Sequence, residues 1–342
     1  MMILPIPNIK STIADLLPGL LLTSALALIA TNLQKLPSIN IFSPLILAVL
    51  IGVSIRNTVG IRSVYKPGIT FSLKKILRLA VILLGLKLSF VQVFSVGLTG
   101  LIIVLVTLVS AFVFTCWFGT YLGVDRKLAQ LIAAGTSICG ASAVLATNSV
   151  VKAADEDVAY AVTIVTLFGT ISMLLYPLLD LLFQTSPREF GLWCGVSIHD
   201  VAQVVAAASQ KGIESGEIAT ISKLSRVIFL IPMLLGLGTL SAHQATESKP
   251  FGQKKLAKLP IPWFVFGFIA LVILNSLSVF PPAFKEIVTQ GNQFLLTISL
   301  AAMGLETNIS KMRQTGLKPL FLGACSWLFI SGFSLGMITI FY

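Results

Sequence analysis

The chain has 342 residues, of which 56% are hydrophobic and only 11% are charged. A soluble domain carries about a quarter charged residues, so this composition excludes an ordinary globular protein and indicates a membrane protein. The net charge of +11 would favour nucleic acid as the partner of a soluble protein. Here the basic residues lie mostly between the apolar segments, so we expect no nucleic-acid partner.

Charge-poor stretches of about the 20 residues needed to cross a bilayer occur along the whole chain. They predict an all-α protein in which one polytopic membrane domain spans residues 1–342. The eleven predicted transmembrane segments cover approximately residues 17–33, 40–55, 74–90, 97–122, 128–150, 158–183, 190–209, 217–241, 262–280, 292–308 and 316–341.

The basic residues also predict an orientation. With a cytoplasmic N-terminus, 17 of the 24 lysines and arginines fall on the cytoplasmic side, as the positive-inside rule requires. We therefore expect a multi-pass protein of the cell inner membrane with its N-terminus inside. This topology places the acidic stretch Asp155–Asp157 outside. The four cysteines form no Cys-x-x-Cys pair, so the sequence predicts neither a metal site nor a cofactor.

One string occurs twice: Gly-Val-Ser-Ile at 52–55 and again at 195–198. Each copy is followed by Lys-x-x-Arg and then by Leu-Leu-Gly-Leu. Five predicted segments separate the copies, so they would enter the membrane from opposite sides, as in transporters built from inverted repeats. Repeat one would cover about 40–183 and repeat two about 190–341, with an additional N-terminal helix at about 17–33. A rival alignment, shifted by 219 residues, leaves three segments unmatched and ranks second.

The fifth and tenth segments are the least typical of continuous helices, because glycines and hydroxyl residues lie near their centres. The pairing predicts that both are discontinuous and cross each other, with half-helix N-termini directed at a shared substrate. The alternative is small-residue packing between continuous helices. The substrate-binding candidates are Gly135, Thr136, Ser137, Cys139, Gly140 and Ser142 in the fifth segment, Thr297 and Ser299 in the tenth, and Gln203 in the seventh.

Several ionisable residues lie within apolar segments, where they commonly mark a pathway or a relay. Glu306, His199 and Asp200 are candidates for binding a coupling ion, either Na⁺ or H⁺. For His199 and Asp200 the alternative is a helix cap, and for Glu306 it is contact with headgroups. Lys223 and Arg226 are candidates for an anion vestibule, with interfacial anchoring as the alternative.

The motif Gly135-Thr-Ser-Ile-Cys-Gly140 resembles the YeiH family of bacterial inner-membrane proteins, which are named as sulfate exporters. The resemblance continues through Lys152-Ala153, Thr166–Thr170, Tyr176-Pro177 and Gly195–Gln203 and covers nearly the whole chain. It implies a fold similar to the bile-acid/sodium symporters and the sodium/proton antiporters, with a panel domain and a crossover core.

Together these patterns predict a secondary active transporter that moves a small anion, such as sulfate or an organosulfonate, by alternating access. Hydroxyl and backbone donors around Thr136, Ser137 and Ser142 suit an oxyanion. The alternatives are an ion- or proton-coupled carrier of another small solute and, less favoured, an anion channel. No catalytic motif is present, so we do not expect an enzyme. The expected partners are the transported solute and membrane lipid; a homodimer stays open.

Overall fold

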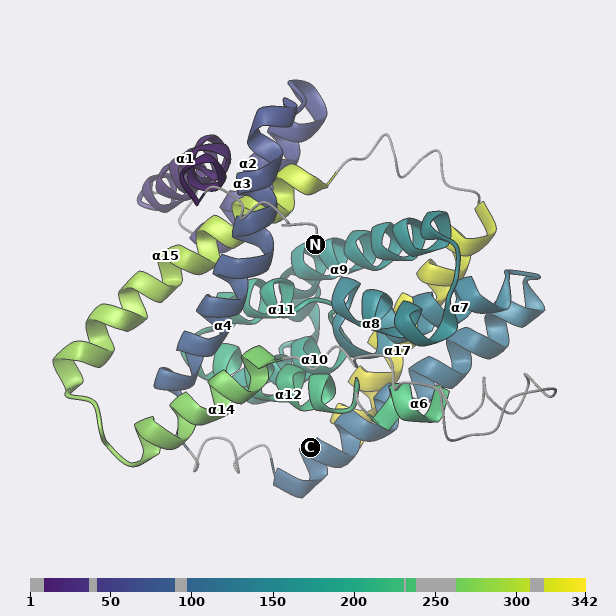
Figure 1. Ribbon diagram of the computed structural model, residues 1–342. Coiled ribbons are helices and arrows are strands. Elements are labelled where there is room, and N and C mark those ends of the chain that lie inside the picture. Colours follow the sequence, from purple (N-terminus) through teal and green to yellow (C-terminus); the bar gives the residue numbers. More distant parts are fainter. Residues whose placement is uncertain (1–8, 37–41, 90–96, 231, 238–262, 308–316) are drawn as a thin grey trace, which may run out of the picture.

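The computed structural model describes residues 9–36, 42–89, 97–230, 232–237, 263–307 and 317–342 (Figure 1). Every regular element within these ranges is a helix, which confirms the prediction of an all-α protein. Each predicted segment contains helix, although some contain two short helices in place of a continuous one.

The helices form two groups, which lie left and right in Figure 1. The first consists of α1 (Ile9–Leu33), α2 (Pro44–Thr58), α3 (Lys66–Phe71), α4 (Leu77–Leu84), α14 (Trp263–Ser276) and α15 (Pro282–Glu306), with the short elements η1 (Ser63–Tyr65), η2 (Ser72–Ile76) and η3 (Gly85–Lys87). The second consists of α6 (Gly97–Tyr121), α7 (Arg126–Ala134), α8 (Ala141–Val151), α9 (Asp155–Phe183), α10 (Pro187–Ser197), α11 (Val201–Ala208), α12 (Ile213–Ile228) and α17 (Leu317–Phe341), with η4 (Gly135–Cys139) and η5 (Ser209–Lys211).

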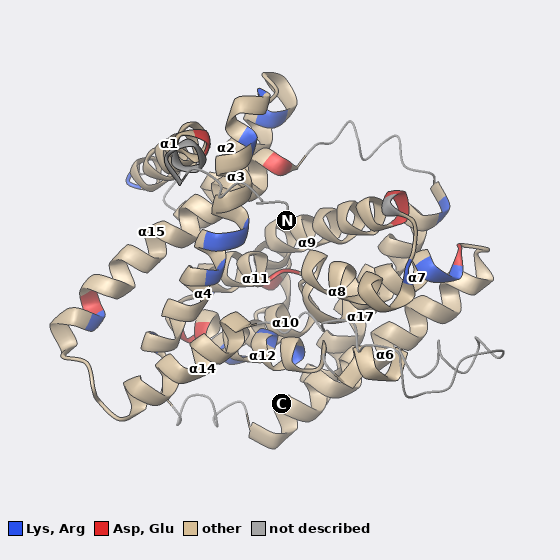
Figure 2. Ribbon diagram, in the orientation of Figure 1, with Lys and Arg blue, Asp and Glu red and all other residues tan. Residues whose placement is uncertain are grey.

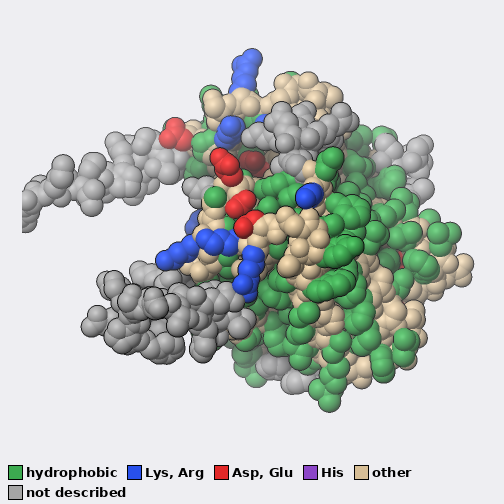
Figure 3. All heavy atoms as spheres, turned by 90° about the vertical axis from the view of Figure 1, so that its right-hand side faces the viewer, with side chains coloured by type: hydrophobic (Ala, Val, Ile, Leu, Met, Phe, Trp, Pro, Cys, Tyr) green, Lys and Arg blue, Asp and Glu red, His purple; other side chains and the backbone are tan. Residues whose placement is uncertain are grey.

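Five helical stretches in the described part of the chain are long and apolar enough to cross a bilayer. They are Ala14–Leu33, Gly97–Tyr121, Glu156–Phe183, Ile213–Leu237 and Leu317–Phe341. The face shown in Figure 3 is largely hydrophobic, and its charged side chains gather in one zone. A water-soluble protein rarely exposes so continuous an apolar surface, so the chain is a helical membrane protein.

The fifth predicted segment is interrupted, as expected, but it does not cross the membrane. Its first leg runs through α7 and η4, and its second leg is α8, so the legs have 14 and 11 residues. At 1.5 Å per residue each leg is about 16–21 Å long, too short for the ~30 Å hydrocarbon core. The Lys127 ammonium, at the start, donates to the Lys152 carbonyl, at the end, over 3.0 Å. Both ends therefore lie on one side. We call residues 126–151 the first hairpin.

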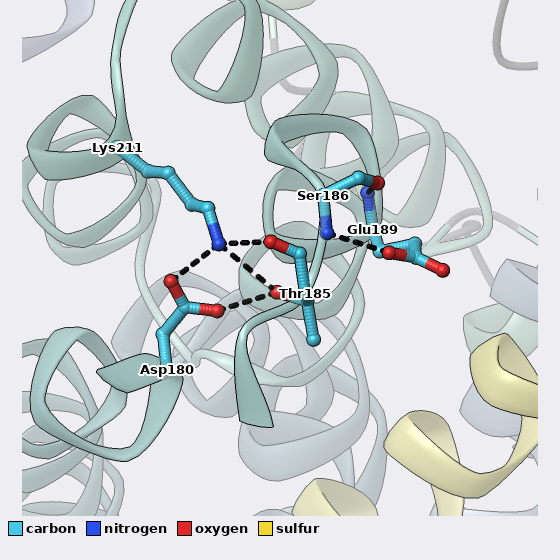
Figure 4. A network of polar contacts seen from close by, with 5 residues as sticks. All are labelled: Asp180, Thr185, Ser186, Glu189 and Lys211. Atoms are coloured by element: carbon cyan, nitrogen blue, oxygen red, sulfur yellow. Dashed lines mark hydrogen bonds and ion pairs between the residues drawn. The ribbon is translucent and has the colours of Figure 1, made fainter. Parts of the chain in front are cut away.

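The seventh predicted segment is a second hairpin, residues 187–211, formed by α10, α11 and η5. Lys211, at its end, forms an ion pair with Asp180 over 2.5 Å and also donates to the Thr185 carbonyl, just before α10 (Figure 4). A capping box between Ser186 and Glu189 starts α10 at the same place. The chain therefore enters and leaves this hairpin on one side.

Helix α9 connects the two hairpins and fixes how they face each other. Its 29 residues span about 42 Å, and it begins three residues after Lys152 and ends two residues before Thr185. The open ends of the hairpins thus lie at opposite ends of α9, and their tips point toward one another.

The prediction that the tenth segment is discontinuous is wrong. Helix α15 runs without a break from Pro282 to Glu306. The hydroxyls of Thr297 and Ser299 donate to carbonyls one turn earlier in the same helix. These hydroxyls are therefore hydrogen-bonded within a helix that stays continuous. Gly304 serves close packing, because a Cβ there would lie 2.4 Å from the Val49 carbonyl of α2. This is the small-residue alternative.

Candidate functional site

The tips of the two hairpins meet in the interior of the second group of helices. The tip of the first hairpin is Gly140, whose backbone has φ of 64° and ψ of −134°, a conformation that favours glycine. A Cβ at this position would lie 3.5 Å from the carbonyl oxygen of His199. Ile198, His199 and Asp200 are the residues between α10 and α11, so the two helix breaks face each other directly.

Two cations on α12 hold the tips together. Lys223 and Arg226 are both fully buried. The Lys223 ammonium donates to the carbonyls of Ile138 at 2.6 Å and Ile198 at 2.7 Å, one in each tip. A buried cation is costly unless it is well hydrogen-bonded, and these carbonyls belong to the negative ends of two half-helices.

Arg226 reaches both tips in the same way. It donates to the carbonyls of Thr136 at 2.8 Å and Ser137 at 2.9 Å in the first hairpin. In the second hairpin it donates to Gly195 and Ile198, both at 3.3 Å. The interruptions of α7 and α10 free these carbonyls from helix bonding, so a cation is the partner that the broken helices require. We call Lys223 and Arg226 the tip cations.

The N-terminus of α11 is closed by its own residues. Asp200 accepts from the Ala202 N–H at 3.0 Å, and the Gln203 side chain accepts from the Asp200 N–H at 3.1 Å. The Gln203 amide also donates to the Thr166 carbonyl and the Thr170 hydroxyl of α9. Gln203 therefore anchors the second tip to α9.

The N-terminus of α8 has no such closure. Its N-cap is Gly140, which offers no side chain. The N–H groups of the first turn and the positive end of the helix dipole favour an anion at such a terminus. Ala141 and Ser142, in the first turn, line the cavity described next.

A cavity of about 950 Å³ lies between the two groups of helices and reaches the hairpin tips. Cys139, Ser142 and Asp200 line it from the tips. From the first group it is lined by Arg56, Lys74, Arg78, Met303 and Glu306, together with the apolar residues beside the basic ones. Figure 2 shows basic residues on the stretch between α3 and α4 and on α12. Lys74 and Arg78 on the first stretch are exposed, whereas Lys223 and Arg226 on α12 are buried.

The remaining predicted residues lie outside this lining. Gly135, Thr136, Ser137, His199 and Gln203 are buried behind the tips, and Thr297 and Ser299 are buried within α15. The hydroxyls of Thr136 and Ser137 and the Nδ1 of His199 have no hydrogen-bond partner among the described residues. Lys223 and Arg226 hold carbonyls at the tips and do not line the cavity.

The cavity faces of η2–α4 and α9 were not among the site residues predicted from the sequence. Thr70, Leu73, Lys74, Leu77, Arg78 and Val81 line the cavity at the three- and four-residue spacing of one helix face. On α9 the residues are Val158, Ala159, Val162, Thr163, Thr166 and Leu167. Lys74 and Arg78 within an apolar stretch were the available signal, since cations inside a membrane segment commonly face a water-filled space.

These features define a multi-pass helical membrane protein, with a cavity that is lined by basic, acidic and apolar residues and ends at two opposed hairpins. The chain belongs to the family described as conserved hypothetical protein 698, whose model matches residues 18–323. It is 40% identical over 333 residues to the UPF0324 membrane protein PA5383 of Pseudomonas aeruginosa, covering 94% of this chain and 93% of the relative.

The UPF0324 inner membrane protein YeiH of Escherichia coli K12 is 37% identical over 331 residues, with 94% and 93% of the two chains covered. YeiH of Salmonella typhimurium is 37% identical over 345 residues, with 98% and 97% covered. These relatives confirm both the predicted family and the inner-membrane location.

Proposed function

We propose that this protein is a secondary active transporter of a small anion. The observation that carries the proposal is the cavity between the two helix groups, which reaches the uncapped N-terminus of α8 and is lined by Arg56, Lys74 and Arg78. Hydrogen-bond donors and cationic side chains that line one cavity of a membrane protein suit an anionic substrate. Closing the cavity on one side and opening it on the other would carry the substrate across.

The topology that we propose has the N-terminus inside and inverted symmetry between the two hairpins. The first hairpin begins and ends at the cytoplasmic side, so the stretch from Lys152 to Asp157 faces the cytoplasm in this topology. A crossing segment would have placed this stretch at the exterior. The second hairpin enters from the exterior. The cavity opens to the cytoplasm, since it is lined by the first half of α9 and by the end of α15.

We also propose that transport is coupled to Na⁺ or H⁺ through the carboxylates of the cavity, Asp200 and Glu306. Oxygen ligands suit Na⁺, and a carboxylate can also carry a proton. His199 is enclosed behind the tips, so a coupling role there requires an opening of the tips. Uptake driven by an imposed ion gradient measures this coupling.

Counterflow in proteoliposomes tests the transport proposal. Vesicles preloaded with unlabelled sulfate, or with an unlabelled alkanesulfonate, should accumulate the same labelled anion from outside. Arg78→Gln should reduce the rate at low substrate concentration at least tenfold, because it removes one of three cavity cations. Arg62→Gln is the matched control, since Arg62 is exposed and does not line the cavity. Protein that stays folded and shows no counterflow with either anion would reject the proposal.

A further inference from the structure

We infer that the substrate is an organic anion with an apolar body, and that inorganic sulfate is a poor substrate. This inference rests on the proposed transport function and names the substrate class of the same cavity. It comes from the size of the cavity, the chemistry of its walls and the balance of its charges.

The size of the cavity is the first argument. A volume of about 950 Å³ would hold roughly thirty water molecules at ~30 Å³ each. It lies at the upper end of the ~300–1,000 Å³ range of pockets that enclose organic ligands. An inorganic oxyanion is only a few water molecules in size and would fill a small part of it.

The walls are the second argument, because most of the lining is apolar. On η2 and α4 the residues Leu73, Leu77 and Val81 lie on the same face as Lys74 and Arg78. From α9, Val162 and Leu167 face the same cavity. A dianion that loses water against such walls gains no compensating hydrogen bonds. An apolar group, in contrast, is stabilised by leaving water.

The charges are the third argument. The cavity has three basic residues, Arg56, Lys74 and Arg78, and two acidic ones, Asp200 and Glu306. When both carboxylates are ionised, the lining carries a net charge of +1. A single negative charge on the substrate balances it. A monoanionic head group beside the basic residues, with an apolar body along the faces of α4 and α9, satisfies both kinds of wall. An arrangement of this type is expected for sulfonates or carboxylates that carry a hydrocarbon group.

The test is counterflow with the full-length protein in proteoliposomes, with labelled butanesulfonate and labelled sulfate measured in parallel. Sulfonates are suitable probes because they stay ionised and do not leak across the bilayer as neutral acids. Unlabelled competitors are sulfate and the straight-chain sulfonates with two to six carbons. We expect the half-inhibiting concentration to fall about threefold to fourfold for each added methylene, the effect of burying one CH₂.

Variants at three cavity positions separate the contribution of the head group from that of the apolar body. Val162→Thr keeps the side-chain shape but replaces one methyl group with a hydroxyl, and it should flatten the dependence on chain length. Leu77→Asn should do the same, and Leu77→Met, which keeps an apolar side chain, should restore the dependence. Arg78→Gln should raise the half-inhibiting concentration of every sulfonate by a similar factor, because all of them have the same head group.

The outcomes distinguish this inference from the proposed function. Sulfate counterflow with competition that is independent of chain length would overturn the inference and leave an anion transporter in place. Absence of counterflow with both labelled anions, in protein that remains folded, would overturn the inference together with the proposed function. Chain-length dependence that survives in both Val162→Thr and Leu77→Asn would place the apolar body elsewhere and overturn the assignment to this cavity.

Discussion

Lys223 and Arg226 lie three positions apart on α12, so they project from the same face of that helix. Between them they donate to carbonyls of residues 136–138 in the first hairpin and of residues 195 and 198 in the second. The repeated Lys-x-x-Arg spacing was visible in the sequence. Its partners could not be predicted, because they are backbone carbonyls of distant segments, and every residue has a backbone carbonyl whatever its side chain.

Arg226→Leu should destabilise the folded protein strongly. The substitution leaves buried carbonyls of Thr136 and Ser137 without a donor, and each such group costs about 1–3 kcal/mol. We expect a loss of more than about 3 kcal/mol, and a smaller loss for Arg226→Lys, which keeps the charge but has fewer donors. The measurement is the temperature at which detergent-solubilised protein ceases to be monodisperse. Arg62→Leu, at an exposed site, is the control; equal losses in Arg226→Leu and Arg62→Leu would contradict the role of the tip cations.

Asp200 both caps α11 and lines the cavity, and two substitutions separate these roles. Asparagine is as good an N-cap as aspartate, so Asp200→Asn should keep the thermal stability of the protein while removing a charge from the cavity. Asp200→Ala should cost about 1 kcal/mol of stability through the lost cap. Transport driven by a Na⁺ or pH gradient should fall in both variants. Full gradient-driven transport in Asp200→Asn would show that Asp200 is a cap alone.

At the scale of elements, the hairpins are where prediction from sequence reached its limit. The glycines and hydroxyls of residues 135–142 correctly indicated an interrupted helix. A broken crossing helix and a re-entrant hairpin, however, have the same length and composition. The contact between Lys127 and Lys152 decides between them, and it depends on the direction in which Gly140 turns the chain.

The tenth segment shows the opposite error. Thr297, Ser299 and Gly304 resemble the composition of a break, yet each has a role in a continuous helix. The hydroxyls bond to their own helix, and Gly304 permits close contact with Gly52 and Val49 of α2. Gly52 belongs to the first copy of Gly-Val-Ser-Ile. In the second copy, a Cβ at Gly195 would lie 2.6 Å from the Ala219 carbonyl oxygen of α12, so this glycine also permits close helix packing. Helix packing is therefore one role that the two copies share.

Labelling with a membrane-impermeant maleimide tests the first hairpin. In a variant whose native cysteines are replaced by alanine, Lys127→Cys and Lys152→Cys should react from the same side of sealed vesicles. Glu214→Cys, placed after the second hairpin, should react from the opposite side. A segment that crossed the membrane would place positions 127 and 152 on opposite sides, and that result would contradict the re-entrant structure.

At the scale of the molecule, the cavity is the feature that the sequence could not provide, because its walls come from segments far apart in the chain. Residues near positions 56, 78, 142, 200 and 306 meet there, and only the fold brings them together. The helical class, the inner-membrane location and the family followed from composition and local motifs, which need no long-range contact.

Coupling belongs to this scale as well, because it requires both helix groups to respond to one ion. Glu306, at the end of α15, faces the cavity from the first group, while Asp200 faces it from the second. Glu306→Gln should therefore abolish uptake driven by an imposed Na⁺ or pH gradient and leave counterflow measurable. Glu286→Gln, on the same helix but outside the cavity lining, should behave as the unmodified protein. Gradient-driven uptake that is unchanged in Glu306→Gln would reject this coupling site.

The meeting of the hairpin tips has an electrical consequence. In the topology that we propose, the cavity that reaches Cys139 and Asp200 brings solution from the cytoplasm to the hairpin tips, so the insulating layer there is thinner than the surrounding bilayer. The membrane potential then falls mainly across the tips and the second hairpin. One elementary charge that passes this layer experiences nearly the full voltage, about 2.3 kcal/mol for each 100 mV, over a short path. For the anion transport that we propose, the step past the tip cations is where the membrane potential would act on the transported charge.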